Sequence, residues 1–173
     1  MRKSFFSLFI LAISMVIISN DAKAQLPEGQ VGIGANFESG LSTAGVFYAF
    51  TQQVDLGINF GYHATTVGDN TSSGVAIGAG GRYFLADNAI DPFVTLGFNY
   101  FNSEVEGTVT PMTFARDGFR ISGGFGAQAQ LVKNLFLFSS VGLTYNILDI
   151  DGGDGSIFNF GSFGVGALYY FDN

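Results

Sequence analysis

The chain has 173 residues, of which 47% are hydrophobic and only 12% are charged, and its formal net charge at pH 7 is −7. This high hydrophobicity excludes intrinsic disorder, and a total of only 7 Lys and Arg residues excludes the basic footprint of a nucleic-acid-binding protein. The chain contains 25 Gly and 20 Phe but no Cys, which excludes a disulfide framework, a thiolate metal site and a lipid-modified cysteine.

The first 24 residues have the pattern of an export signal. Arg2 and Lys3 precede an apolar run over 5–18, and Ala22-Lys23-Ala24 follows it with two small residues two positions apart. This order is typical of a secretory signal peptide, and the run of about 14 apolar residues is shorter than the roughly 20 that a spanning helix needs. We therefore predict a signal peptide over 1–24 and an exported domain over 25–173, which keeps 4 basic residues against 13 acidic ones.

Hydrophobic residues after the signal alternate with polar or small residues. Because successive side chains of a β-strand point to opposite faces, the alternation predicts strands with one apolar face and one polar or small face. The predicted strands are 30–38, 42–50, 54–66, 74–85, 92–104, 116–131, 135–148 and 157–171. Most of them are as long as the roughly 9–11 residues of a tilted transmembrane strand, or longer.

The connections between these strands alternate in length. Those at 51–53, 86–91 and 132–134 are short, whereas the polar stretches 67–73, 105–115 and 149–156 are longer; the first connection, near 39–41, is an exception because it is tight. Short turns at one end and longer loops at the other are typical of an outer-membrane barrel with both termini in the periplasm.

The distribution of small residues decides which face of the barrel is outside. A soluble, lipocalin-like barrel would have an apolar lumen and a charged exterior. The second face of the predicted strands carries mainly Gly, Ser and Asn with few charges, and such small side chains suit the narrow lumen of an eight-stranded barrel instead. A closed barrel also pairs every backbone N–H and C=O group, as hydrocarbon requires. We therefore predict an all-β fold: an eight-stranded, antiparallel, up-and-down transmembrane β-barrel.

The last strand ends in Gly166-Ala167-Leu168-Tyr169-Tyr170-Phe171. This spacing resembles the C-terminal signal that the barrel-assembly machinery reads in bacterial outer-membrane proteins, with Gly166, Tyr169 and Phe171 as its matching residues. Together with the export signal and the strand pattern, it makes the chain similar to the small OmpX-like or opacity-type barrels, often called porin-family proteins. The resemblance implies secretion to the periplasm, insertion into the outer membrane, and contact with lipid and lipopolysaccharide. The chain departs from many such proteins because Asp172 and Asn173 follow the final aromatic residue.

Residues that could carry catalysis or bind a metal are few. His63 is the only His, and Ala-Thr-Thr follows it, without the Ser of the His-x-Ser-Asn pattern of lipid A deacylases, so no nucleophile–base pair can be assigned. The acidic segment 149–155 resembles a calcium-binding EF-hand loop, but Gly153 and Phe160 stand where that loop needs ligands. We therefore predict no catalytic residue, no cofactor and no metal site.

Four charged residues have the alternation that points into the lumen: Glu38, Asp55, Arg82 and Arg120. Because an isolated charge in a narrow lumen is costly to desolvate, we expect these residues to pair. Strand directions predict an Asp55–Arg82 pair in the periplasmic half and a Glu38–Arg120 pair in the extracellular half. Phe136 and Phe138 are predicted to fill the periplasmic half beside the first pair.

Three functions fit these observations. The first is a non-enzymatic structural or surface-interaction barrel with a closed lumen, in which the loops 67–73, 105–115 and 149–156 meet an unknown partner outside the cell. The second is a narrow channel for ions or small solutes, and the third is a lipid A-modifying acylase. A wide diffusion pore is excluded, because open aqueous channels need about 16–18 strands.

Overall fold

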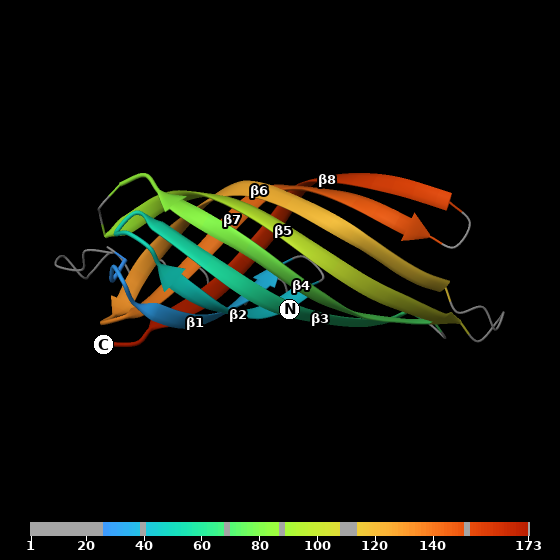
Figure 1. Cartoon of the computed structure of the whole chain (residues 1–173), viewed down its shortest axis with the longest axis horizontal. Coiled ribbons are helices and arrows are strands. Elements are labelled where there is room, and N and C mark those ends of the chain that lie inside the picture. The colour runs from blue at the N-terminus through green and yellow to red at the C-terminus, as the bar shows by residue number, and fades with distance from the viewer. Residues whose placement is uncertain are drawn as a thin grey trace, which may run out of the picture.

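The computed structural model describes residues 26–38, 41–67, 70–86, 89–107, 114–150 and 153–172, so the predicted signal peptide lies outside the described residues. The described residues form eight strands: β1 (Val31–Glu38), β2 (Leu41–Ala49), β3 (Val54–Val67), β4 (Asn70–Phe84), β5 (Ile90–Gly107), β6 (Phe114–Val132), β7 (Leu135–Ile150) and β8 (Gly153–Tyr170). Each pairs with the next, and β1 pairs antiparallel with β8, which closes the barrel (Figure 1). The predicted fold is therefore confirmed. None of the described residues belongs to a helix that is long and apolar enough to cross a membrane.

The two ends of the barrel differ. At the turn end, short connections join β2 to β3, β4 to β5 and β6 to β7, and the C-terminus lies there (Figure 1). At the opposite loop end, strands pair further than predicted, as far as Val67↔Asn70, Val105↔Phe114 and Ile150↔Gly153. Parts of the stretches predicted as loops, 67–73, 105–115 and 149–156, therefore lie in strands: 67, 70–73, 105–107, 114–115, 149–150 and 153–156. The prediction was wrong because it ended each strand where the hydrophobic alternation stops, whereas a hairpin continues as long as its backbones pair.

The outer face of the barrel is a belt of exposed apolar side chains. Leu96 is 67% exposed and Phe125 is 68% exposed, and large apolar residues on every strand share this face. Tyrosines lie near both limits of the belt: Tyr48, Tyr83 and Tyr169 toward the turn end, and Tyr62, Tyr100 and Tyr145 toward the loop end. Soluble proteins rarely expose more than a few hundred Å² of contiguous apolar surface, whereas an apolar band between two aromatic girdles is what a transmembrane barrel requires. This face rules out the lipocalin-like alternative.

Phe and Gly residues fit together inside the lumen at three cross-strand pairs. A Cβ atom added to any of three lumen glycines would collide with the ring of the residue directly opposite on the neighbouring strand. The pairs are Phe47 with Gly57, Phe93 with Gly126 and Phe138 with Gly166. An eight-stranded barrel has space for few large side chains, so each ring occupies the volume that its partner lacks.

Gly126→Ala is therefore expected to destabilise the barrel by about 1–3 kcal/mol, the usual cost of adding a methyl group to a filled core. The new Cβ would meet the Phe93 ring and the Ser139 carbonyl oxygen. Gly123→Ala, three residues away on β6, is the matched control, because its Cβ would meet only the Thr95 carbonyl oxygen at 3.8 Å. Urea unfolding of the refolded proteins measures both, and equal stabilities would contradict the packing argument.

The barrel wall is uneven in height. The β1–β2 hairpin ends at Glu38 and Leu41, well short of the other hairpins (Figure 1). β8 pairs with β1 only from Gly164 to Tyr170, and β3 pairs with β2 only up to Tyr62. In the described part of the chain, the wall is therefore not joined between residues 63–67 of β3 and 153–163 of β8, a break that we call the side notch. At the end of the side notch nearer the turn end, Gly161 adopts a left-handed φ of +82°. A bulge shifts the β7–β8 register at this position.

Candidate functional site

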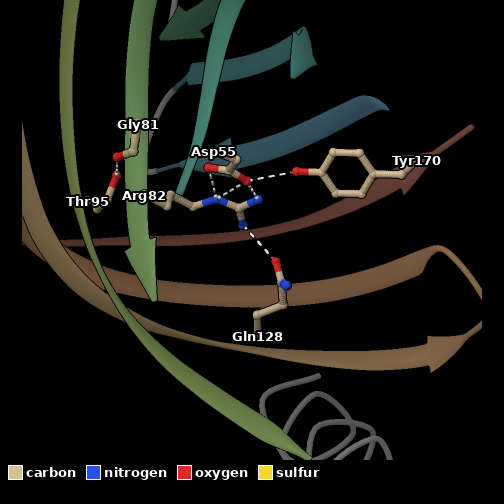
Figure 2. Close-up of polar contacts among 6 residues, drawn as sticks. All are labelled: Asp55, Gly81, Arg82, Thr95, Gln128 and Tyr170. Carbon is tan, nitrogen blue, oxygen red and sulfur yellow. Dashed lines mark hydrogen bonds and ion pairs between the residues drawn. The ribbon is translucent and has the colours of Figure 1, made fainter. Parts of the chain in front are cut away.

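An ion pair between two neighbouring strands projects into the lumen near the turn end. Asp55 on β3 and Arg82 on β4 are direct cross-strand partners, so their side chains leave the sheet side by side on the lumen face. Arg82 Nε donates hydrogen bonds to both carboxylate oxygens of Asp55 at 3.1 Å, and Arg82 Nη2 donates to Asp55 Oδ2 (Figure 2). The Arg82 side chain is 7% exposed and the Asp55 side chain 1%. The structure thus brings together the first pair that the sequence predicted.

Two further polar groups complete this cluster. Arg82 Nη1 donates to Gln128 Oε1 at 3.0 Å, and the Tyr170 hydroxyl donates to Asp55 Oδ2 at 2.9 Å (Figure 2). Both side chains are fully buried. The sequence pattern did not single out Gln128 and Tyr170, although both follow the lumen-facing alternation of their strands near the turn end. Four strands, β3, β4, β6 and β8, therefore meet in one hydrogen-bonded network.

Aromatic rings surround the guanidinium of Arg82. Its central carbon lies 4.9 Å from the ring centroid of Phe138 and 5.3–5.8 Å from those of Phe47, Phe84 and Phe93. These positions suit cation–π attraction, which strengthens away from water. Buried apolar residues pack together at the same end: Leu26, Ala49, Phe84, Phe93, Phe136, Leu168 and Tyr170. We call the polar cluster and these residues the plug.

The plug separates the turn end from a cavity on its loop side. The cavity has a volume of about 140 Å³. Asp55, Arg82 and Phe138 line it together with polar residues of the half of the lumen nearer the loop end, which we call the upper lumen. A single water fills roughly 10–15 Å³ of such space, so the cavity has room for several waters. The lumen is therefore filled with side chains at the turn end and contains a cavity on the loop side.

The structure does not contain the predicted ion pair between Glu38 and Arg120. Both side chains line the cavity, but they form no ion pair with each other, and Arg120 Nε instead donates to Asn146 Oδ1 at 2.8 Å. The reason is topological: Arg120 on β6 has Asn146 on β7 as its cross-strand partner, whereas β1, which carries Glu38, pairs with β2 and β8. Sharing one half of the lumen did not make the two charges neighbours.

His63 lies in the upper lumen and has a contact that the sequence did not predict. Its Nε2 atom is 3.4 Å from the Ser103 hydroxyl, across the intervening strand β4. A catalytic pair of this kind needs a third group to orient the base, and no carboxylate among the described residues forms an ion pair with His63. The described residues also contain no cluster of three or more metal-ligating side chains.

The three residues of the predicted assembly signal have distinct surroundings. Tyr169 and Phe171 are exposed on the outer face, with their ring centroids 5.5 Å apart, where they belong to the girdle at the turn end. Gly166 faces the lumen under the ring of Phe138. Asp172 beyond them accepts hydrogen bonds from Lys133 Nζ at 2.9 Å and Asn134 Nδ2 at 2.7 Å, which lower the pKa of its carboxyl group. The end of the chain is thus tied to the β6–β7 turn.

Phe171→Asp is expected to reduce the amount of folded barrel while leaving export unchanged. A charge in the girdle opposes insertion, and the substitution also removes the final aromatic residue of the predicted signal. Quantifying folded and unfolded protein in isolated membranes measures the effect, and Phe50→Asp, at an exposed aromatic residue in the β2–β3 turn, is the control. Equal loss in both variants would contradict a special role for the last strand.

Solved structures with the same fold come from several bacteria. The N-terminal β-barrel domain of Pseudomonas aeruginosa OprF matches with a TM-score of 0.61 and 17% identity, over 83% of this chain and 98% of that one. Neisserial surface protein A matches with a TM-score of 0.55 and 12% identity, over 82% and 95%. A major outer membrane protein of Thermus thermophilus matches with a TM-score of 0.52 and 13% identity, over 82% and 98%. The fold is that of the small eight-stranded outer-membrane barrels.

The resemblance to outer-membrane barrels that the sequence indicated is therefore confirmed at the level of the fold. No protein-family model matches the chain, and no curated protein matches it by sequence. Identities of 12–17% carry the fold and not the activity, because unrelated functions occur on one barrel architecture. The function of this barrel therefore rests on the residues of its own lumen and surface.

Proposed function

We propose that the protein is a non-enzymatic barrel of the bacterial outer membrane whose lumen is closed and which acts through the surface at its loop end. The observation that carries the proposal is the plug. Charged, polar and aromatic side chains fill the turn end, and Asp55, Gln128 and Tyr170 have no accessible surface there. Ions would have to pass a guanidinium that is already bound to a carboxylate and enclosed by rings.

The outer belt supports the proposed location. Its apolar side chains need hydrocarbon around them, and lipid and lipopolysaccharide are the molecules that an outer-membrane barrel meets there. In this placement the turn end faces the periplasm and the barrel-assembly machinery reads the end of β8. The long hairpins at the loop end then stand beyond the girdle of Tyr62, Tyr100 and Tyr145, where acidic side chains such as Glu104 and Asp149 face the outside.

Two measurements on the full chain test this proposal. After cell fractionation the protein should be in the outer membrane, and boiled and unboiled samples should migrate differently in detergent gels, because a closed hydrogen-bonded barrel resists unfolding. Proteoliposomes that contain the refolded barrel should not swell in isotonic arabinose. Soluble periplasmic protein with identical migration would contradict the membrane barrel, and arabinose-driven swelling would favour the narrow channel over the closed lumen.

A further inference from the structure

Arg120 is a lumen cation without a carboxylate partner among the described residues. Its Nε atom donates to the neutral amide of Asn146, its guanidinium carbon lies 5.7 Å from the ring centroid of Phe101, and no described carboxylate oxygen is within 4.0 Å of its nitrogen atoms. A guanidinium stays charged at any physiological pH. It also holds its N–H donors in a planar fork that fits a carboxylate through two parallel hydrogen bonds. Arg82 binds the carboxylate of Asp55 in this way, whereas the guanidinium of Arg120 borders an open space.

That space is a second pocket of about 100 Å³, lined by Leu41, His63, Ala76, Asn99, Phe101 and Arg120. Leu41, Asn99 and Arg120 also line the larger cavity above the plug, so the two spaces share the same cation. Three of the lining side chains, Leu41, Ala76 and Phe101, are apolar. A pocket with one cation and an apolar wall fits a ligand that has one anionic group and a hydrocarbon chain.

The side notch offers such a chain a way out of the lumen. Leu41 is the first residue of β2, and beyond it toward the loop end no described residue of β3 pairs with β8. Ile157 on β8 stands directly opposite Asn146, the partner of Arg120, so it is on the lumen face, and it is nevertheless 47% exposed. A ligand held at Arg120 can therefore extend past Leu41 and Ile157 toward the girdle at the loop end. The plug blocks the direction toward the turn end.

We propose that the upper lumen binds the carboxylate of a medium-chain fatty acid, with Arg120 on the carboxylate and Leu41 and Phe101 against the chain. Glu38 lines the larger cavity and opposes a second negative charge there. Removing the Glu38 charge is thus expected to strengthen binding, whereas removing the Arg120 charge weakens it. This opposite response distinguishes a site in the lumen from general partition of fatty acid into the bilayer.

The test uses the refolded full chain in phosphatidylcholine nanodiscs and lauric acid labelled with ¹³C at its carboxyl carbon. The wild type should give a carboxylate resonance that is absent from empty nanodiscs and saturates at one ligand per barrel. Arg120→Gln should weaken binding at least tenfold, and Glu38→Gln should tighten it. Lys133→Gln is the matched control, because it removes a cation at the turn end that is 79% exposed.

Two outcomes would overturn the proposal. One is a wild-type spectrum identical to that of empty nanodiscs, and the other is unchanged binding in Arg120→Gln when the gel shift shows that this variant is folded. If Arg120→Gln does not fold, the wild type with methyl laurate decides. The neutral ester should compete at least tenfold more weakly than laurate, and equal competition would contradict recognition of the carboxylate.

Discussion

Arg82→Ala is expected to lower the free energy of unfolding of the refolded barrel by about 3–5 kcal/mol, the usual cost of leaving one buried charge without its partner. Asp55 would remain fully buried. Of its partners in the plug it would keep only the Tyr170 hydroxyl. The four rings around the guanidinium would also face an empty volume. Because the chain has no Trp, unfolding in urea is best followed by the fraction of protein that migrates as the folded band in detergent gels.

The second ion pair of the described residues provides the control for this prediction. Lys133 Nζ and Asp172 Oδ2 are 2.9 Å apart at the turn end, but the two side chains are 79% and 55% exposed. Exposed pairs contribute little because water and salt screen them, so Lys133→Ala should leave the urea midpoint unchanged. A joint Asp55→Leu and Arg82→Met variant should recover part of the lost stability, since an apolar pair suits the aromatic surroundings. Equal midpoints for Arg82→Ala and Lys133→Ala would mean that the plug does not hold the barrel together.

Leu96→Arg is expected to cost about 2–4 kcal/mol, the penalty for an arginine at the middle of the lipid-facing band of a barrel. Leu96 is 67% exposed on β5 and lies between the tyrosine girdle at the turn end and the one at the loop end. Phe50→Arg is the matched control, because Phe50 is 61% exposed just beyond the end of β2. Near the interface the same charge should cost about 0–1 kcal/mol. Folding into phosphatidylcholine vesicles followed by urea unfolding measures both variants.

The contrast between these two positions separates a membrane barrel from a soluble one. In water, substitutions at exposed positions away from special features usually change stability by less than about 0.5 kcal/mol. A soluble barrel would therefore tolerate Leu96→Arg as well as Phe50→Arg. Equal, small effects in both variants would contradict the lipid-facing belt.

The fold could be predicted because each strand carries its own signal. Alternation of large apolar with small residues marks the strands, and the same alternation gives the face of each side chain. Asp55 and Arg82 could be placed together because they lie on consecutive strands near a short turn, where register is nearly fixed. Their further partners Gln128 and Tyr170 come from strands distant in sequence, so their contact depends on how the closed barrel is staggered.

The same limit explains what the sequence did not reveal at the loop end. Glu38 and Arg120 have the correct alternation, but the pairing order of the strands puts Asn146 and not Glu38 beside the guanidinium. The side notch arises because β1 and β2 are 8 and 9 residues long whereas β5 and β8 have 18 residues each. The loop-end parts of the long strands are polar, because a paired strand beyond the membrane needs no apolar face. Their sequences therefore lack the hydrophobic alternation by which strands are predicted.

We propose that the plug closes the lumen of this barrel. This proposal is tested most directly by recording currents across planar lipid bilayers after insertion of the refolded full chain, with an empty-detergent control. The wild type should show no discrete conductance steps in KCl solution, because charged, hydrogen-bonded and aromatic side chains fill the lumen at the turn end. Reproducible single-channel steps in the wild type would contradict the closed lumen and identify the protein as a narrow channel.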